Sequence, residues 1–219
     1  MIPPSSKSRA VSRLYQFGSA RWYNAFRTIW TRATSRQAES ELDRMVRVEA
    51  EDARNVLDIG CGTGHNLGRL LRLGGPFESY RGVDLTQAML EIARADYHAE
   101  ARATFDQTDL HDLEGSTERY DLILCTWVAS HLERPRDVFE VAYRLLAPGG
   151  SAFLLTLTRP RWYVRAWFTP FVLLFQAAYV DPEDLRDLPG LCTRTTWTAR
   201  LATLVHLKRP PREAPEGSQ

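Results

Sequence analysis

The stretch VLDIGCGTGHN, residues 56–66, constrains the fold more than any other part of the chain. An apolar run carrying one carboxylate breaks into three glycines at alternate positions. This pattern predicts a buried strand, a tight turn and a helix, an arrangement in which the main chain can approach a ligand closely. The ligand could be the pyrophosphate of a dinucleotide or a molecule without phosphate.

The glycine spacing and two acidic residues favour a ligand without phosphate. A dinucleotide turn has the spacing G-x-G-x-x-G, whereas this chain has G-x-G-x-G with His65 at the sixth position. Asp58 would repel a pyrophosphate but could orient a cation. Asp84 ends the next predicted strand, where a ribose diol finds its acceptor in a doubly wound fold. S-adenosylmethionine, a nucleoside with a cationic, phosphate-free tail, satisfies both observations.

Strand-like runs alternate with amphipathic helical patterns through the middle of the chain, and the last stretch is rich in threonine and β-branched residues. The predicted strands are 56–59, 80–83, 103–105, 122–125 and 152–157, and the predicted helices are 66–73, 86–96 and 135–146. Runs this apolar are typical of a parallel sheet covered on both faces. We therefore predict an α/β, Rossmann-like, doubly wound and mostly parallel sheet, with a terminal antiparallel hairpin within 191–207.

The chain divides into three predicted parts. Residues 1–50 are predicted to form an N-terminal helical cap and substrate-lid segment, and residues 51–209 are predicted to form an S-adenosylmethionine-binding domain with an apolar insert at 159–190. Residues 210–219 form a flexible tail. A length of 219 residues suits one domain with a small appendage.

Composition narrows the class of protein. A formal net charge of +1, with 44% hydrophobic and 25% charged residues, excludes a long disordered chain and argues against a nucleic-acid partner. Three scattered cysteines indicate free thiols in a reducing compartment, so we expect a cytoplasmic protein. No apolar run reaches the roughly 18 residues of a membrane span. The first acid is Glu39, after seven bases, so a transit peptide stays open as an alternative.

Five blocks in order resemble the class I S-adenosylmethionine-dependent methyltransferases. They are VLDIGCGTG, GVDLTQAMLEIAR, DQTDLHDL, YDLILCTWVASHLERP and RLLAPGGSAFLLTL. A single G-x-G-x-G would be a weak signal, whereas five blocks with the family's order and spacing are a specific one. The resemblance covers residues 54–157 and implies an enzyme with S-adenosyl-L-methionine as its cofactor.

The resemblance also implies roles for individual residues. Asp58 would hold the methionyl ammonium through water, and Asp84 would take the ribose hydroxyls. The other residues expected to contact the cofactor are Gly60, Cys61 and Gly62 beneath it, Leu85, Asp109 and Leu110 around the adenine, and Cys125 and Thr126 on the methionine side.

The chain is most similar in pattern to the ubiquinone/menaquinone C-methyltransferase group, but it departs from that group near the N-terminus. The group carries a Tyr-Asp pair twice in an N-terminal helix. Here Tyr15 is followed by Gln16 and Tyr23 by Asn24. The carboxylates of that group therefore have no counterpart in this chain.

Methyl transfer to a phenol, an acid or an enolisable carbon is helped by a base, whereas an amine acceptor needs none. His131, after the fourth strand, is the first candidate for that base, with Tyr23 and His111 behind it. The alternative is that His131 only holds its loop or begins the next helix. The scattered histidines and unpaired cysteines give no signal for a metal site.

The acceptor is indicated by the segment RPRWYVRAWFTPFVLLFQAAYVDPEDL, which has no charge from Ala166 to Val180. Thr169-Pro170 resembles an N-cap and first helical position, so we expect a helix over Pro170–Tyr179. This helix could pack against the sheet, roof a lipophilic acceptor, or lie on a membrane beside its arginines. The aromatic N-terminal segment would form the opposite wall. RNA binding is the third interpretation of interleaved bases and aromatics.

We therefore predict an S-adenosylmethionine-dependent methyltransferase acting on a lipophilic small molecule that is quinone-, polyketide- or lipid-like. The alternatives are a peripheral membrane phospholipid N-methyltransferase and a catalytically lapsed S-adenosylmethionine-binding protein. A transient contact with a membrane surface belongs to the first two. The acceptor atom and the oligomeric state do not follow from the sequence.

Overall fold

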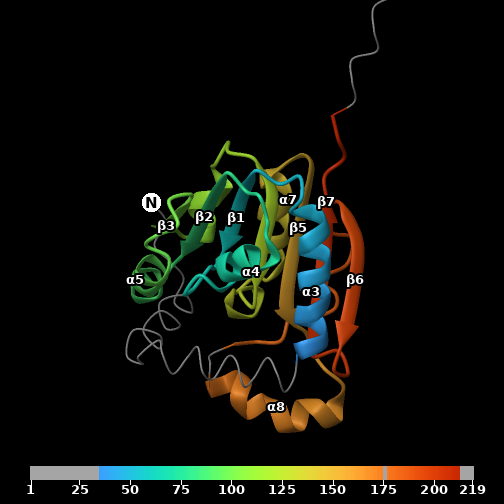
Figure 1. Ribbon diagram of the computed structural model, residues 1–219. Coiled ribbons are helices and arrows are strands. Elements are labelled where there is room, and N and C mark those ends of the chain that lie inside the picture. The colour runs from blue at the N-terminus through green and yellow to red at the C-terminus, as the bar shows by residue number, and fades with distance from the viewer. Residues whose placement is uncertain (1–34, 175–176, 213–219) are drawn as a thin grey trace, which may run out of the picture.

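The computed structural model describes residues 35–174 and 177–212 (Figure 1). The N-terminal segment 1–34, with the candidate Tyr23, lies outside the described residues, as does the tail 213–219. The described part is a seven-stranded mixed sheet with helices on both faces, preceded by a helix. The predicted α/β, Rossmann-like class is confirmed.

The elements follow one another in the predicted strand–helix alternation. The strands are β1 (Asn55–Ile59), β2 (Ser79–Asp84), β3 (Ala103–Gln107), β4 (Tyr120–Thr126), β5 (Leu146–Leu157), β6 (Leu191–Trp197) and β7 (Ala202–Lys208). The helices are α3 (Arg36–Glu49), α4 (His65–Leu73), α5 (Gln87–Asp96), α6 (Leu110–Glu114), the 3₁₀ turn η2 (Ala129–His131), α7 (Arg136–Leu145) and α8 (Trp162–Leu174).

The sheet has the strand order β3-β2-β1-β4-β5-β7-β6. The first five strands are parallel, with Asp58 of β1 between Gly82 of β2 and Leu124 of β4. β7 runs antiparallel to both β5 and β6, so the predicted terminal hairpin is confirmed. The strand order reverses between β1 and β4, which is where open α/β sheets bind their ligands.

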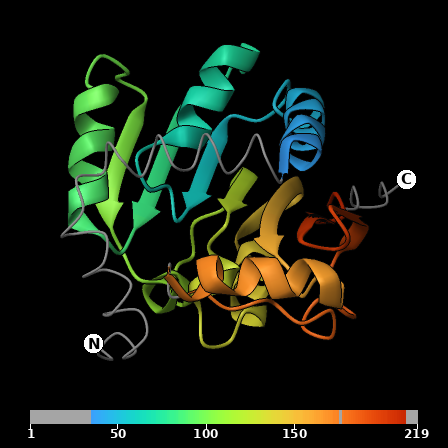
Figure 2. The same ribbon diagram turned by 90° about the horizontal axis from the view of Figure 1, so that it is seen from below.

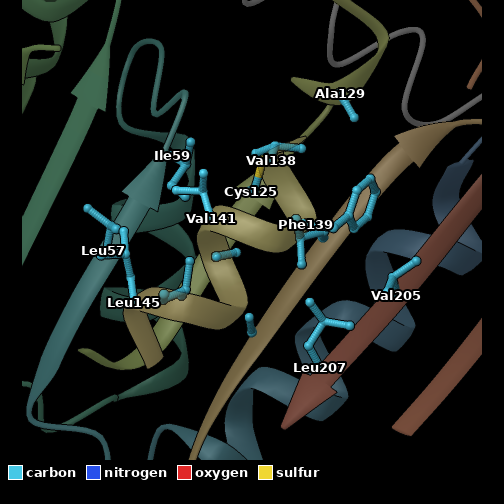
Figure 3. Close-up of a cluster of buried hydrophobic side chains, with 14 of the residues drawn as sticks. Leu57, Ile59, Cys125, Ala129, Val138, Phe139, Val141, Leu145, Val205 and Leu207 are labelled. Atoms are coloured by element: carbon cyan, nitrogen blue, oxygen red, sulfur yellow. The ribbon is translucent and has the colours of Figure 1, made fainter. Parts of the chain in front are cut away.

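The hydrophobic core has two parts, one on each face of the sheet. One cluster lies beneath α3, α4 and α5, and the other lies beneath α6 and α7. Figure 3 shows the second cluster, in which side chains of α7 meet those of β1, β4 and β7. The face of α7 predicted from its spacing, Val138, Val141, Ala142 and Leu145, is the buried one.

β5 begins at Leu146, six residues before the predicted start at Ala152. The Pro-Gly-Gly sequence after α7 lies within the strand, at a shift of the register between Tyr120 and Leu122 of β4. The main-chain N–H of Arg209 donates to the carbonyl of Gly150 at 3.0 Å. Hydrogen bonding to the chain just after β7 therefore extends β5 through residues whose local sequence is typical of a loop.

The limits predicted for the apolar helix were wrong. α8 begins at Trp162, and Pro170 lies inside it rather than at its first position. The carbonyl of Arg161 starts the helix by accepting from the N–H groups of Val164 and Arg165, each at 3.0 Å. Thr169 does not cap a helix, because its hydroxyl donates to the carbonyl of Arg165 at 2.8 Å. One missing N–H inside the helix is thus tolerated on an exposed element.

α8 lies beyond the carboxyl ends of the parallel strands, as Figures 1 and 2 show. The chain then returns to the sheet, where Val180 pairs with Thr158 just after β5. The N–H of Ala178 donates to the carbonyl of Ser130 in η2 at 2.7 Å. The segment after β5 is therefore attached to the same edge of the sheet at which β4 ends.

Two glycines with positive φ provide a test of the packing between β6, β7 and α7. A Cβ at Gly190 (φ +66°) would lie 2.6 Å from the carbonyl oxygen of Lys208 and 2.2 Å from the Tyr143 ring, whereas one at Gly149 (φ +85°) would meet nothing within 4 Å. Gly149→Ala should lower the free energy of unfolding by about 1 kcal/mol, the cost of a left-handed conformation. Gly190→Ala should cost about 1–3 kcal/mol more, because of overpacking. Urea denaturation measures both, and equal losses would contradict this packing.

Candidate functional site

The candidate site lies at the carboxyl edge of β1, β2, β3 and β4, around the reversal of the strand order. The topology brings predicted residues from four separate stretches of sequence to this edge. They are Asp58, Gly60, Cys61 and Gly62 at the end of β1, Asp84 and Leu85 at β2, Asp109 and Leu110 after β3, and Cys125 and Thr126 at β4.

The glycine turn is hydrogen-bonded to the end of β2. The N–H groups of Gly60 and Cys61 both donate to the carbonyl of Val83, at 2.8 and 3.0 Å. The N–H of Gly62 donates to the carboxylate of Asp84 at 2.9 Å. The turn and the acid of the second strand therefore form one unit, although 22 residues separate them.

Gly60 and Gly62 both have positive φ, but their surroundings differ. A Cβ at Gly60 would lie 2.1 Å from a methyl carbon of Val128, so the turn packs directly against the loop that follows β4. A Cβ at Gly62 would meet nothing within 4 Å. The main chain is thus open to a ligand at Gly62, whereas Gly60 is needed for packing.

Asp84 is half-buried and accepts main-chain hydrogen bonds on both carboxylate oxygens. The second bond comes from the N–H of Thr86 at 2.8 Å. Burial raises the pKa of Asp84, and these N–H donors partly oppose the rise. Each carboxylate oxygen has two lone pairs, so the group can still accept hydrogen bonds from a diol. The neighbouring Leu85 is half-buried, as a surface for a flat ring requires.

Asp58 has no solvent exposure. Its carboxylate accepts from the hydroxyl of Tyr80 at 2.6 Å and from the amide of Asn66 at 2.9 Å. Burial raises the pKa of Asp58 to about 6, while these two donors and the nearby charge of Arg69 lower it. The expected contact of Asp58 with a ligand through water stays a prediction. Asp58 can act on a bound cation through its charge.

A buried ionic network, which sequence reasoning missed, lies next to Asp58. Arg69 of α4 is 1% exposed and donates to Asn66, Glu39 and Asp43, with a distance of 2.6 Å to the last. Glu39 and Asp43 belong to α3, so the network joins the helix before β1 to the helix after it. The signal in the sequence was an arginine on the side of α4 that carries its buried leucines. A charge in such a position requires partners.

The same network reaches the loop after β4 through Trp127. The indole N–H donates to Glu39 at 3.2 Å, and the main-chain N–H donates to Leu155 at 2.6 Å. Trp127 has φ +68°, a strained value for a bulky residue. Such strain persists only where the surroundings determine the conformation, and it is concentrated at functional sites. Trp127 is therefore a further candidate site residue.

At the end of β4, Thr126 can offer its side chain to a ligand, whereas Cys125 can offer only its main chain. Thr126 is half-buried, and its hydroxyl accepts from Asn66 at 3.2 Å. Cys125 is buried, as is Cys61, and burial raises the pKa of both thiols well above the usual range. Both cysteines are therefore neutral, and they can contact a ligand only through their main-chain groups.

Asp109 and Leu110, which follow β3, line a pocket. Asp109 caps α6 by accepting from the N–H of His111 at 3.3 Å. The pocket is also lined by His111, by Leu132, Glu133 and Arg134 between η2 and α7, and by Asp137 in the first turn of α7. The two residues expected near an adenine therefore share one cavity with the loop after β4.

The candidate bases lie in different surroundings. His131 is the last residue of η2 and half-buried, and its main-chain N–H donates to Val128 at 2.8 Å. It thus lies in the loop that packs against Gly60. His111 is exposed, with its ring 3.2 Å from the carboxylate of Glu114. Tyr23 lies outside the described residues.

The described residues contain neither a cluster of metal-binding side chains nor a membrane-spanning helix. Within 35–174 and 177–212, no three side chains of His, Cys, Asp or Glu are grouped so that they could hold a metal ion. Over the same ranges, no helix has the length and apolar character needed to cross a membrane.

Residues 56–150 match a family model described as a methyltransferase domain. A ubiquinone biosynthesis O-methyltransferase from Alkalilimnicola ehrlichii is 32% identical over 120 residues, which are 52% of this chain and 47% of the relative. An arsenite methyltransferase from Aquipseudomonas alcaligenes is 37% identical over 111 residues, 47% of this chain and 32% of that protein. The chain thus spans about half or less of the length of these curated relatives.

Solved structures share the fold. An N-methyltransferase from Bradyrhizobium japonicum, in complex with S-adenosyl-L-homocysteine, superposes with a TM-score of 0.64 at 16% identity, covering 94% of this chain and 100% of that one. An O-methyltransferase family protein from Burkholderia thailandensis has a TM-score of 0.62 at 24% identity, over 78% of this chain and 56% of that one. At these identities the likeness concerns the fold.

The raised pKa of Asp58 predicts a pH-dependent effect of Asp58→Asn. An aspartate ionises at about 3.8 in the unfolded chain and at about 6 here, so the ionised carboxylate opposes folding above pH 6 and this cost disappears as pH falls towards 4. Part of this cost is still present at pH 4.5, so the stability of the variant relative to the native protein should be about 2 kcal/mol more favourable at pH 7.5 than at pH 4.5. Denaturant unfolding at both pH values measures the difference, in which other titrating groups cancel. An equal effect at both pH values would contradict the assignment.

Proposed function

We propose that this chain, whose residues 56–150 match a methyltransferase-domain model, is a class I S-adenosylmethionine-dependent methyltransferase that transfers a methyl group from S-adenosyl-L-methionine to a lipophilic small molecule. The observation that carries the proposal is the pairing of the open main chain at Gly62 with the carboxylate of Asp84. It provides a close approach for a ligand beside an acceptor for a ribose diol. The third glycine of the turn is at the fifth position, whereas a dinucleotide-binding turn has it at the sixth.

The residues around this pairing fit S-adenosyl-L-methionine. Asp84 would accept from the ribose hydroxyls, and Leu85, Asp109 and Leu110 would surround the adenine. Gly60, Cys61 and Gly62 would lie beneath the cofactor with main-chain groups, and Cys125 and Thr126 would line its methionine end. Asp58, with both oxygens already accepting hydrogen bonds, would stabilise the methionyl ammonium through its field.

The cofactor supplies an electrophilic methyl group on a sulfonium. The chain's own residues bind it, align the acceptor and exclude water, and alignment and desolvation account for much of the rate in such displacements. The loop after β4 carries both candidates for work at the acceptor. His131 would take a proton from a phenol, an acid or an enolisable carbon, and Trp127 would orient a flat acceptor with its ring.

The acceptor is proposed to be quinone-, polyketide- or lipid-like. The support is α8, a helix rich in apolar residues that lies over the edge of the sheet that carries the site. A ubiquinone biosynthesis O-methyltransferase among the relatives agrees with a quinone-like molecule. A lipid headgroup amine is the second candidate acceptor, and it would make the chain a phospholipid N-methyltransferase that works without a base.

The cofactor proposal is tested by ligand stabilisation. S-adenosyl-L-homocysteine should raise the melting temperature, because it binds only the folded state. Asp84→Asn should weaken binding by about tenfold or more, because it removes the charge and half of the acceptor capacity. Asp96→Ala, an exposed carboxylate at the end of α5, is the matched control and should bind normally. Stabilisation by NAD in place of S-adenosyl-L-homocysteine would reject the proposal.

The role of His131 is tested by a variant with an intact cofactor site. His131→Ala should bind S-adenosyl-L-homocysteine with native affinity and lower the turnover by about 100-fold. Turnover is measured as transfer of a labelled methyl group to quinols, phenols and acyl lipids offered separately. His111→Ala, which changes an exposed ring, is the control. A loss of only a few-fold in His131→Ala would assign His131 to holding its loop, and label in a headgroup amine would favour the second acceptor.

A further inference from the structure

α8 exposes an unusual set of large side chains. Trp162 is 77% exposed, Trp167 is 83% exposed and Leu173 is 68% exposed, and the half-exposed Tyr163 packs edge-on against Trp162. Tryptophan is highly buried on average in globular proteins. The other large hydrophobic side chains exposed in the described part of the chain are single residues on α3, α4 and β6. Contiguous exposure of this kind marks an interaction surface.

The two sides of α8 differ in exposure. Val164, Phe168 and Val172 recur every four residues and are the less exposed positions, with Val172 at 5%. This spacing places them on one side of a helix. Trp162, Trp167 and Leu173 are therefore on the more exposed side of the helix. These three side chains are exposed enough to contact a binding partner.

The charge of α8 selects the kind of partner. Arg161 and Arg165 are exposed, and the sequence has no acidic residue from 159 to 180. Arg159 is neutralised by Asp181, with Nε 2.7 Å from Oδ1. The start of α8 thus exposes two cationic side chains in addition to the tryptophans and the leucine. Helices that lie in the interface of an anionic bilayer have this composition, because tryptophan occupies the headgroup level and arginine pairs with lipid phosphates.

We propose that the more exposed side of α8 docks on the surface of an anionic lipid bilayer. The docked helix would lie flat, with Trp162, Trp167 and Leu173 in the interface and the arginines at the phosphates. Figures 1 and 2 show α8 at the edge of the sheet that carries the candidate site, so the site would face the membrane. The use of this arrangement to draw a lipophilic acceptor from the bilayer rests on the proposed function, whereas the docking itself does not.

The chain's own N-terminal segment is the rival occupant of this surface. Residues 1–36 contain seven basic residues and no acid. Their charge has the same sign as that of α8, which opposes covering one with the other and suits attraction of both to the same anionic surface.

The test is sedimentation of the full-length protein with phosphatidylcholine vesicles, either pure or with about a third phosphatidylglycerol. The protein should bind the anionic vesicles only, and binding should weaken as salt is raised. Arg161→Gln with Arg165→Gln should lower the partition coefficient by about tenfold or more. Arg44→Gln with Arg47→Gln, which removes two exposed charges from α3, is the matched control and should bind normally.

Quenching of tryptophan fluorescence by brominated lipids identifies the docking segment. Trp162→Phe with Trp167→Phe should lose most of the quenching, whereas Trp22→Phe with Trp30→Phe should retain it. Loss in the second pair alone would assign the contact to the N-terminal segment and overturn the proposal. Absence of vesicle binding in a protein that is stabilised by S-adenosyl-L-homocysteine, or capture by an acidic protein in place of vesicles, would overturn it while leaving the proposed function intact.

Discussion

The buried carboxylate of Asp58 sets the conditions that its neighbours have to meet. It lies at the carboxyl end of the central strand β1 without solvent contact, so its ionised form depends on the donors Asn66 and Tyr80 and on the charge of Arg69. Arg69 is itself buried and is balanced by the acids of α3. A buried ion that loses one partner is strongly destabilising. The helices α3 and α4, which precede and follow β1 in the chain, therefore form one electrostatic unit with the site.

This electrostatic unit extends to the end of β4 and the loop after it, where the acceptor is proposed to bind. Glu39 accepts from the indole of Trp127, which holds a strained residue directly after β4, and Asn66 reaches Thr126 on the same strand. A helix that precedes the first strand thus orients the loop proposed to meet the acceptor. Small displacements of α3 would be felt there, because a positioned catalytic group loses rate steeply with misplacement.

Much of the fold could be predicted from patterns within single segments. The glycine turn, the strand ends at Asp58 and Asp84 and the buried face of α7 all follow from local spacing. The start of α8 was predicted wrongly because Thr169 and Pro170 have the sequence pattern of a helix start. In the structure, the N–H of Arg161 donates to the carbonyl of Ala199 in the β6–β7 turn at 3.0 Å, and the helix begins at the next residue. Strand β5 was shortened because its first residues are strand only through their pairing with β4 and the chain after β7.

The sequence by itself determined the class of the protein: the order of strands and helices, the phosphate-free glycine turn and the acids beside it are properties of short segments. Only the tertiary structure decided what those acids do. Asp58 and Asp84 have the same side chain and similar local sequence positions, yet one is enclosed by Tyr80 and Asn66 and the other is half-buried beside the open main chain of Gly62. The reason is that burial and hydrogen-bond partners come from elements far apart in the chain, and these set the charge state and accessibility of a carboxylate.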